Sequence, residues 1–366
     1  MAGADPLRGD SLQVGYHDDP PMPCYDVPST MLTPELLRTL MLPAAGDATP
    51  SRWLSAASGL VHAKGRLYVI ADDAHHLFHV AFDVNRPHET ASPLQAVRLL
   101  PGELPTAPKA RKEAKPDLES VLLLPATAAA PEGRLLCLGS GGKANRRRAL
   151  EMPLRNDGDV AADAVVVHDL TAFFSPLQAE FADLNIEGAF LSDSTLTLLQ
   201  RGNKATVARS ACLCFDADQW LGWLAGSRRR VPTLKAVHPL DFGQVAGVPL
   251  CPTDATLLAD GYWVVTLVAE DTDDSVKDGH CVASALAVMT PEHELGALYR
   301  LQGNPKVEGV ALANPGDDHA LSLLLVTDAD DPAQPSQLLR VDLPARQGIV
   351  APHAVHSTAG ASKSGR

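Results

Sequence analysis

The stretch Glu187-Gly188-Ala189-Phe190 shows the pattern that decides the fold: an acidic residue, a small residue and then an apolar run. Similar phrases, each led by a polar or acidic residue, occur at four other places: Ser58-Gly59-Leu60-Val61, Glu119-Ser120-Val121-Leu122, Asp254-Ala255-Thr256-Leu257 and Glu308-Gly309-Val310-Ala311. They recur at intervals of roughly 60 residues, which is typical of a supersecondary unit used several times.

Each phrase is followed by two further short runs rich in Leu, Val and Ala, separated by turns that contain Gly, Asp or Pro. Such runs predict meandering antiparallel strands. In most units a fourth run follows, at 94–100, 164–170, 234–240 and 297–301. Four strands in a repeated unit predict an all-β fold, a single β-propeller with four-stranded antiparallel blades. Five phrases predict five blades, and six are the alternative if one blade is degenerate.

The fifth unit has no obvious fourth strand of its own. The segment 36–42, ahead of the first unit, is expected to supply it and to close the ring, which removes an exposed sheet edge. We therefore expect a flexible N-terminal arm at residues 1–32, the propeller at 33–345 and a loose C-terminal tail at 346–366.

Composition limits the classes of function. The 366 residues carry a formal charge of −13, which repels a phosphate backbone and disfavours nucleic-acid binding. No apolar run approaches the roughly 18 residues of a membrane helix, and residues 1–28 lack the apolar segment of a signal peptide. We expect a soluble, cytoplasmic protein that binds neither nucleic acid nor membrane. The sequence leaves the oligomeric state open.

The cysteines do not indicate a disulfide framework. The chain has six, with no Cys-x-x-Cys pair. Cys212 and Cys214 alternate with Leu213, so they are predicted to point to the same face of one strand. We interpret the cysteines as small buried residues of a reduced protein.

In a propeller the innermost strand of each blade runs along the central channel, so the five lead residues are expected to meet at its mouth. Four of them are carboxylates. Because hard oxygen ligands suit Ca²⁺ or Mg²⁺, the sequence predicts one of these cations as cofactor and no organic cofactor. The predicted ligands are Glu119, Glu187, Asp254 and Glu308. The alternative is that these carboxylates accept backbone N–H bonds or pair with Lys115, Lys306 or Arg201.

The second strand of each blade runs back to the same mouth. Asp72 and Glu270 lie at the ends of such strands and are the candidate general bases. The Gly-rich turn 139–142 exposes backbone N–H groups, and arginine side chains match phosphate or carboxylate groups. The predicted partner is therefore a small anionic molecule. Its predicted binding residues are Ser140, Arg146, Arg148, Arg201, Asn203 and Asp328.

Several phrases together resemble a bacterial family of unknown function, over about residues 33–343. They are Lys115-Pro116-Asp117-Leu118-Glu119, Asn185-Ile186-Glu187-Gly188-Ala189, Ala269-Glu270-Asp271-Thr272-Asp273-Asp274, Val307-Glu308-Gly309-Val310-Ala311 and Val326-Thr327-Asp328-Ala329-Asp330-Asp331-Pro332. More distantly, the chain is similar to the phytase-like esterase propellers and to the gluconolactonase and paraoxonase class.

The distant resemblance implies calcium held in the central channel and metal-assisted hydrolysis of an ester or lactone, by analogy of fold. This chain differs from that pattern because its inner ring is mostly Glu, with little Asn. The resulting hypothesis is a metal-assisted hydrolase of a small anionic ester, lactone or phosphoester, in which Arg201 orients the substrate. The alternative is a non-catalytic propeller whose mouth binds a ligand or peptide.

Overall fold

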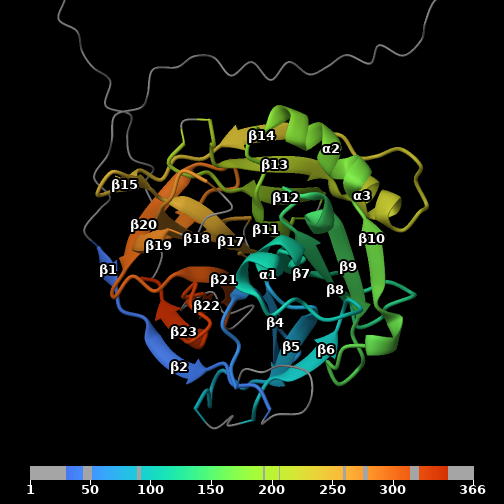
Figure 1. Ribbon diagram of the computed structural model, residues 1–366, viewed down its shortest axis with the longest axis horizontal. Helices are drawn as coiled ribbons and strands as arrows, with labels where there is room; N and C mark the ends of the chain where they lie inside the picture. Colours follow the sequence, from blue (N-terminus) through green and yellow to red (C-terminus); the bar gives the residue numbers. More distant parts are fainter. Residues whose placement is uncertain are drawn as a thin grey trace, which may run out of the picture.

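The computed structural model of the chain describes residues 30–43, 52–88, 92–192, 194–205, 207–258, 261–274, 279–313 and 321–344. Figure 1 shows five blades arranged in a ring, which confirms the predicted five-bladed propeller. The predicted arm, apart from residues 30–32, and the predicted tail lie outside the described residues.

Each blade is an antiparallel meander that begins with its innermost strand. Blade one consists of β3 (Ala57–Ala63), β4 (Arg66–Ala71), β5 (His76–Ala81) and β6 (Gln95–Arg98). Blade two consists of β7 (Leu118–Leu124), β8 (Arg134–Gly139), β9 (Arg148–Pro153) and β10 (Val166–Asp169). Blade three consists of β11 (Ile186–Leu191), β12 (Thr195–Gln200), β13 (Ala211–Asp216) and β14 (Ala236–Pro239).

Blade four consists of β17 (Cys251–Leu257), β18 (Trp263–Asp271), β19 (His280–Met289) and β20 (Leu295–Leu301). Blade five combines β21 (Val307–Leu312), β22 (Ser322–Thr327) and β23 (Gln337–Asp342) with the N-terminal strand β2 (Glu35–Thr39). A two-stranded hairpin, β15 (Gln244–Val245) and β16 (Val248–Pro249), precedes blade four.

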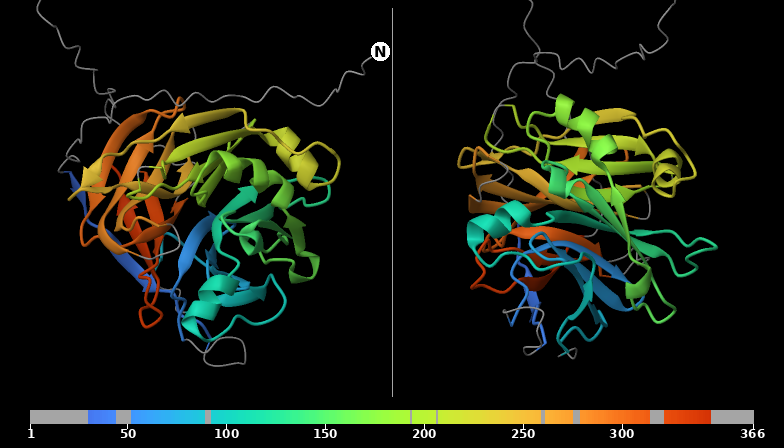
Figure 2. Two further views of the ribbon diagram at one scale, coloured as in Figure 1. Left: turned by 45° about the horizontal axis from the view of Figure 1, so that its top comes forward. Right: turned by 45° about the vertical axis from the view of Figure 1, so that its right-hand side comes forward.

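N-terminal chain closes the ring, as predicted. Strand β2 pairs antiparallel with β23, with Leu36 opposite Leu339. A further strand, β1 (Met31–Leu32), pairs in parallel with β20 of blade four. Both views in Figure 2 show this blue N-terminal chain beside the orange and red blades. The start of the described chain therefore covers the outer edges of two neighbouring blades.

The core consists of five apolar layers, one between each pair of neighbouring blades. In β4, for example, Leu67 and Val69 face blade five, whereas Tyr68 and Ile70 face blade two. Because both faces of every blade are buried, the strands read as continuous apolar runs rather than as alternating ones. This arrangement explains how a chain with 5% aromatic residues builds a core from Leu, Val and Ala.

Three short α-helices lie against the ring in the described part of the chain. Helix α2 (Thr171–Glu180) covers the layer between blades two and three with Phe173 and Phe174. Helix α3 (Ala217–Leu224) begins at Asp216, whose side chain accepts a hydrogen bond from the Gln219 N–H. Helix α1 (Pro108–Ala114) lies over the centre of the ring in Figure 1. Among the described residues, no helix has the length and apolar character needed to cross a bilayer.

The pairing register shifts by one residue near the start of every innermost strand, which is a β-bulge. The bulged residues are Ser58, Glu119, Glu187, Thr253 and Glu308. The repeated phrase is thus the sequence signature of a bulge. The prediction of Asp254 as the lead residue of blade four was wrong by one position, because the bulge in that blade falls on Thr253.

A small residue follows the bulge because neighbouring innermost strands approach closely there. A Cβ atom on Gly188 would lie 2.9 Å from the Asp254 Cα of the next blade. A Cβ atom on Gly309 would lie 2.9 Å from backbone atoms of Gly59 and Leu60. These separations are shorter than ordinary contacts, so a larger residue would push the blades apart at the axis.

Strand β2 provides a test of ring closure. Leu37 is buried in the layer between blades five and one, whereas its neighbour Leu36 is 51% exposed. Leu37→Ala should lower the free energy of unfolding by about 2–5 kcal/mol, since it opens a cavity in that layer. Leu36→Ala, the matched control, should change it by less than about 0.5 kcal/mol. Urea unfolding of both variants measures this, and equal effects would show that β2 does not close the ring.

Candidate functional site

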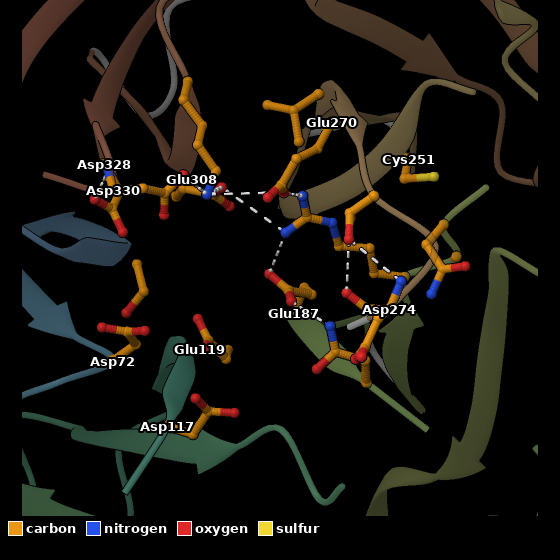
Figure 3. Close-up of a pocket in the computed structure, with 18 of the residues that line it drawn as sticks. Asp72, Asp117, Glu119, Glu187, Cys251, Glu270, Asp274, Glu308, Asp328 and Asp330 are labelled. Carbon is orange, nitrogen blue, oxygen red and sulfur yellow. Dashed lines mark hydrogen bonds and ion pairs between the residues drawn. The ribbon is translucent and has the colours of Figure 1, made fainter. Parts of the chain in front are cut away.

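A polar cavity lies at the end of the ring where the innermost strands begin. It encloses about 780 Å³ of open space, including the solvent at its entrance. Nine carboxylate side chains line it, together with five Lys and Arg side chains. Figure 3 labels the nine carboxylates: Asp72, Asp117, Glu119, Glu187, Glu270, Asp274, Glu308, Asp328 and Asp330.

Three of the five bulged residues are glutamates that face this cavity, namely Glu119, Glu187 and Glu308. The other two bulged residues are Ser58 and Thr253, whose hydroxyl groups bond to the next blade. Ser58 donates a hydrogen bond to the Leu118 carbonyl, and Thr253 donates one to the Val307 carbonyl. Each acceptor is the first residue of the next blade's innermost strand. Blades one and four therefore use the bulge to hold the ring together at the axis.

Asp254 does not line the cavity, contrary to prediction. It occupies the position that is Gly or Ser in the other blades, and its side chain is directed into the contact between β17 and β21. Its carboxylate accepts hydrogen bonds from the Ala255 N–H at 2.8 Å and the Val310 N–H at 2.9 Å. Burial raises the pKa of Asp254 well above its usual value, and these two N–H donors only partly oppose that effect.

Arg201 and Lys306 form the first of two charged groups in the cavity. Arg201 contacts carboxylates from blades three, four and five: Glu187 at 3.2 Å, Glu270 at 2.5 Å and Glu308 at 3.8 Å. Lys306 contacts Asp330 at 2.5 Å, Glu308 at 3.4 Å and Glu270 at 3.8 Å. Asn185 donates a hydrogen bond of 2.6 Å to Glu187. In this group carboxylates outnumber cations.

Asp72, Asp117 and Glu119 form the second group, which joins blades one and two. One oxygen from each carboxylate lies within 4.8 Å of the other two. The Lys115 ammonium bridges Asp72 and Asp117, at 2.9 Å from the latter. Asp117 also accepts hydrogen bonds from Arg146 at 2.6 Å and from Ser140 at 2.5 Å.

Glu119 differs from its neighbours because its carboxylate has no hydrogen-bond or ion-pair partner among the described residues. It is 9% exposed and lies in Figure 3 between the Asp72 and Asp117 side chains and Glu187. Burial raises its pKa well above the usual value. The charges of Glu187, Asp117 and Asp72 raise the pKa further, and Lys115 opposes this.

Other carboxyl groups of the cavity show the same tendency. Burial, the largest cause, raises the pKa of Asp72 to about 6, although Lys115 opposes the shift. Burial likewise raises the pKa of Glu308 to about 7, although Lys306 opposes the shift. Asp328 also has a strongly raised pKa, because of burial and of the charges of Asp330 and Asp72. The cavity thus holds more negative charge than its own cations balance.

The structure brings together most of the residues that the sequence analysis singled out. Besides the three glutamates, the cavity is lined by Asp72, Arg146, Arg201, Asn203, Glu270 and Asp328. Ser140 lies behind Asp117 as its hydrogen-bond donor. Arg148 lies outside the cavity at the start of β9, where Asp169 is its charged neighbour.

Asp117, Asn185 and Cys251 were missed as cavity residues, whereas Lys306 was predicted as an ion-pair partner and does pair with Glu308. A regular signal would have placed all four at the cavity. Asp117, Asn185, Cys251 and Lys306 each lie two positions before a bulged residue. Because each comes just ahead of the bulge at the start of an innermost strand, all four side chains line the cavity at that end of the ring. Asp117 has a further mark, a left-handed backbone with φ of 55°, which is uncommon for a residue other than glycine.

The pH dependence of stability provides a test of the charge imbalance in the cavity. A carboxyl group whose pKa is higher in the folded state than in the unfolded state favours folding at low pH. That contribution is lost as the pH rises through the folded value, about 6 for Asp72 and about 7 for Glu308. In the presence of a chelator the Tm should therefore fall between pH 5 and pH 8.

Glu119→Gln removes one of the responsible charges and should raise the Tm at pH 8 by roughly 2–4 °C, with little change at pH 5. Glu103→Gln, at an exposed carboxylate paired with Arg98, is the control and should melt as the unaltered protein does. Thermal melts over this pH range measure both. A Glu119→Gln protein that is less stable at pH 8 would contradict the charge argument.

The similarity of this chain to known proteins is low. No curated protein matches the sequence. Solved structures that are similar include a hypothetical protein from Leishmania major, with 11% identity, coverage of 86% of this chain and 92% of that one, and a TM-score of 0.40. The arabinanase Arb43A of Bacillus subtilis is 11% identical, with coverage of 80% of this chain and 95% of that one and a TM-score of 0.37. A luciferin-regenerating enzyme is 14% identical, with coverage of 80% of this chain and 78% of that one and a TM-score of 0.34.

A family model agrees with the resemblance found in the repeated phrases. Residues 53–343 match the model described as "Family of unknown function (DUF6929)". This range spans all five innermost strands and every residue of the cavity. The chain belongs to this family of unknown function.

Proposed function

We propose that the axial cavity binds a hard divalent cation, Ca²⁺ or Mg²⁺, and that the protein is a metal-assisted hydrolase of a small ester, lactone or phosphoester. The observation that supports this is the convergence of Asp72, Asp117 and Glu119, whose oxygens lie within 4.8 Å of one another. Such a set of carboxylate oxygens suits these cations rather than a soft metal. It replaces the ligand set proposed from the sequence, since Asp254 lies elsewhere.

The charges around these three carboxylates fit a divalent cation. Lys115 and Arg146 supply two positive charges against three negative ones, so Glu119 is left without a counter-ion. A bound cation would remove the repulsion that raises the pKa of Glu119. Lys115 is its natural competitor, because the ammonium already bridges Asp72 and Asp117.

When bound, the cation would polarise the scissile carbonyl or phosphoryl group and lower the pKa of a coordinated water. Glu187 is the residue best placed to take a proton from that water. It lies beside Glu119 in the cavity, and burial raises its pKa, with Arg201 opposing the shift. Asn185 and Arg201 orient its carboxylate through hydrogen bonds.

This assignment changes the roles proposed from the sequence. Asp72 becomes a ligand rather than the base. Glu270 is a poorer base than Glu187 because its carboxylate contacts two cations, Arg201 and Lys306, whereas Glu187 contacts one cation, Arg201, among the described residues. Arg201, which already contacts three carboxylates, acts by positioning Glu187 rather than by holding a substrate anion.

We also propose that the protein works in the reducing cytoplasm. All five cysteines in the described part of the chain are free, and four of them are buried. Free cysteines are usual in a reducing compartment.

Cation binding is tested by thermal melting of protein freed of metal with a chelator. Ca²⁺ or Mg²⁺ at about 100 times its Kd should stabilise the fold by about 2.7 kcal/mol, because it binds only the folded form. The stabilisation should be larger at pH 8 than at pH 5, since the ligands must be ionised. Glu119→Gln should abolish the shift, and Glu103→Gln should retain it.

Lys115 provides a second variant for the same measurement. Lys115→Gln removes the competing ammonium, so it should lower the Tm of the metal-free protein and increase the shift caused by the cation. If neither Ca²⁺ nor Mg²⁺ shifts the Tm of the unaltered protein or of Lys115→Gln, the cavity holds no such cation. The ring would then be better explained as a non-catalytic binding module.

Catalysis is tested with panels of chromogenic esters, lactones and phosphoesters in the presence of the cation. Hydrolysis should disappear with a chelator and should fall by roughly 10²–10⁴-fold in Glu187→Gln, the loss expected for a general base. Glu103→Gln should keep full activity. Cation binding without turnover of any compound would favour the binding-module alternative over the hydrolase.

A further inference from the structure

Three metal-ligating side chains meet at the contact between blades three and four. Cys214 lies on β13, His238 on β14, and His293 in the turn between β19 and β20. In the β13–β14 register Cys212 is opposite His238 and Cys214 is opposite Ala236. Paired residues and residues two apart share one face of a sheet, so Cys214 and His238 are neighbours on the face that packs against blade four.

The three side chains are already close to the geometry of a bound ion. One ligand atom from each lies within 4.8 Å of the other two. The Cys214 Sγ is 4.0 Å from the His293 Nε2, and the two imidazole rings stack with centroids 4.3 Å apart. Ligand atoms of a tetrahedral zinc ion, at about 2.0–2.3 Å from the metal, are roughly 3.3–3.6 Å apart. A bound ion would draw the three ligand atoms closer together, and the stacked imidazole rings would turn so that one nitrogen of each points at it.

The surroundings hold these side chains in place and leave them otherwise unused. Cys214 is 4% exposed, and its Sγ lies 3.8 Å from the Thr197 hydroxyl. The His293 ring packs edge-on against Trp263, whose indole N–H donates to the Thr290 carbonyl in the same turn. The His293 Nδ1 is buried without a hydrogen-bond partner in the described structure.

We propose that Cys214, His238 and His293 form a zinc site that joins blade three to blade four. One thiolate and two imidazoles are the ligand types that Zn²⁺ prefers over Ca²⁺ or Mg²⁺. On binding, the Cys214 S–H bond breaks, the sulfur keeps the electron pair and bonds to the zinc, and one proton passes to solvent. Three protein ligands leave the fourth position to a water molecule.

The site has a clear structural consequence, and it is independent of the axial cavity. Blades three and four are separate sheets that pack through an apolar layer, with polar contacts at its edge such as the hydrogen bond from the Lys204 N–H to the Thr272 carbonyl. A metal with ligands from both blades would cross-link them.

Metal titration of the full chain, after removal of bound metal with a chelator, tests the proposal. Co²⁺, which replaces zinc and reports its ligands, should bind with the near-ultraviolet absorption of a thiolate–cobalt bond and the strong visible bands of a tetrahedral site. One equivalent of Zn²⁺ should displace it. Zn²⁺ should release one proton and raise the Tm.

Cys214→Ser should abolish the thiolate band and weaken Zn²⁺ binding by more than about 100-fold, since even outer partners of a metal contribute 10–100-fold. Cys212→Ser, at a buried cysteine on the same face two residues away, is the matched control and should bind within about threefold of the unaltered protein. His293→Gln, at a partly exposed turn, should also weaken binding, and its Tm in chelator shows whether the fold is intact.

Three results would overturn the zinc site. They are the absence of a thiolate band in the unaltered protein, equal Zn²⁺ binding by Cys214→Ser and Cys212→Ser, and loss of Zn²⁺ binding in Glu119→Gln but not in Cys214→Ser. The last result would assign the metal to the axial cavity.

Discussion

Electrostatic repulsion at the axis is the constraint on which the rest of this structure depends. Five blades that share one axis bring their innermost strands together, and three of those strands place a buried glutamate at the same end of the ring. Buried like charges are costly unless they are paired, protonated or bound to a cation. In the cavity most carboxylates are paired with Lys or Arg side chains, and burial raises the pKa of Glu119, which has no such partner.

The pairing is divided unequally around the ring. Arg201 and Lys306 tie blades three, four and five together through shared carboxylates. Lys115 does the same for blades one and two through Asp72 and Asp117, and Arg146 pairs with Asp117 within blade two. Glu119 belongs to the second group but is paired with neither of its cations, and it lies on the side of that group that faces Glu187. Stability alone does not explain a buried carboxylate without a partner, so Glu119 is the residue that most favours a functional role for the cavity.

The β-bulge at the start of each innermost strand has two different roles in this ring. In blades two, three and five it carries a glutamate into the cavity, and in blades one and four it carries a hydroxyl group that bonds the next blade. The small residue after it allows close approach of neighbouring strands, and in blade four Asp254 fills that place and bonds the next blade itself. Similar phrases in the sequence thus serve chemistry at some positions and ring assembly at others.

The sequence by itself determined the propeller, its four-stranded blades and the closure by N-terminal chain, and favoured five blades over six, because turns and apolar runs are local and recur with the unit. It also indicated the end of the ring at which Glu119, Glu187 and Glu308 meet. It did not determine that Thr253 rather than Asp254 is bulged, since a shift of one residue in register leaves no trace in composition. Only the tertiary structure decided which carboxylates are paired and that Arg148 lies outside the cavity. It alone placed His238 and His293 beside Cys214, because those contacts join residues from different strands and blades.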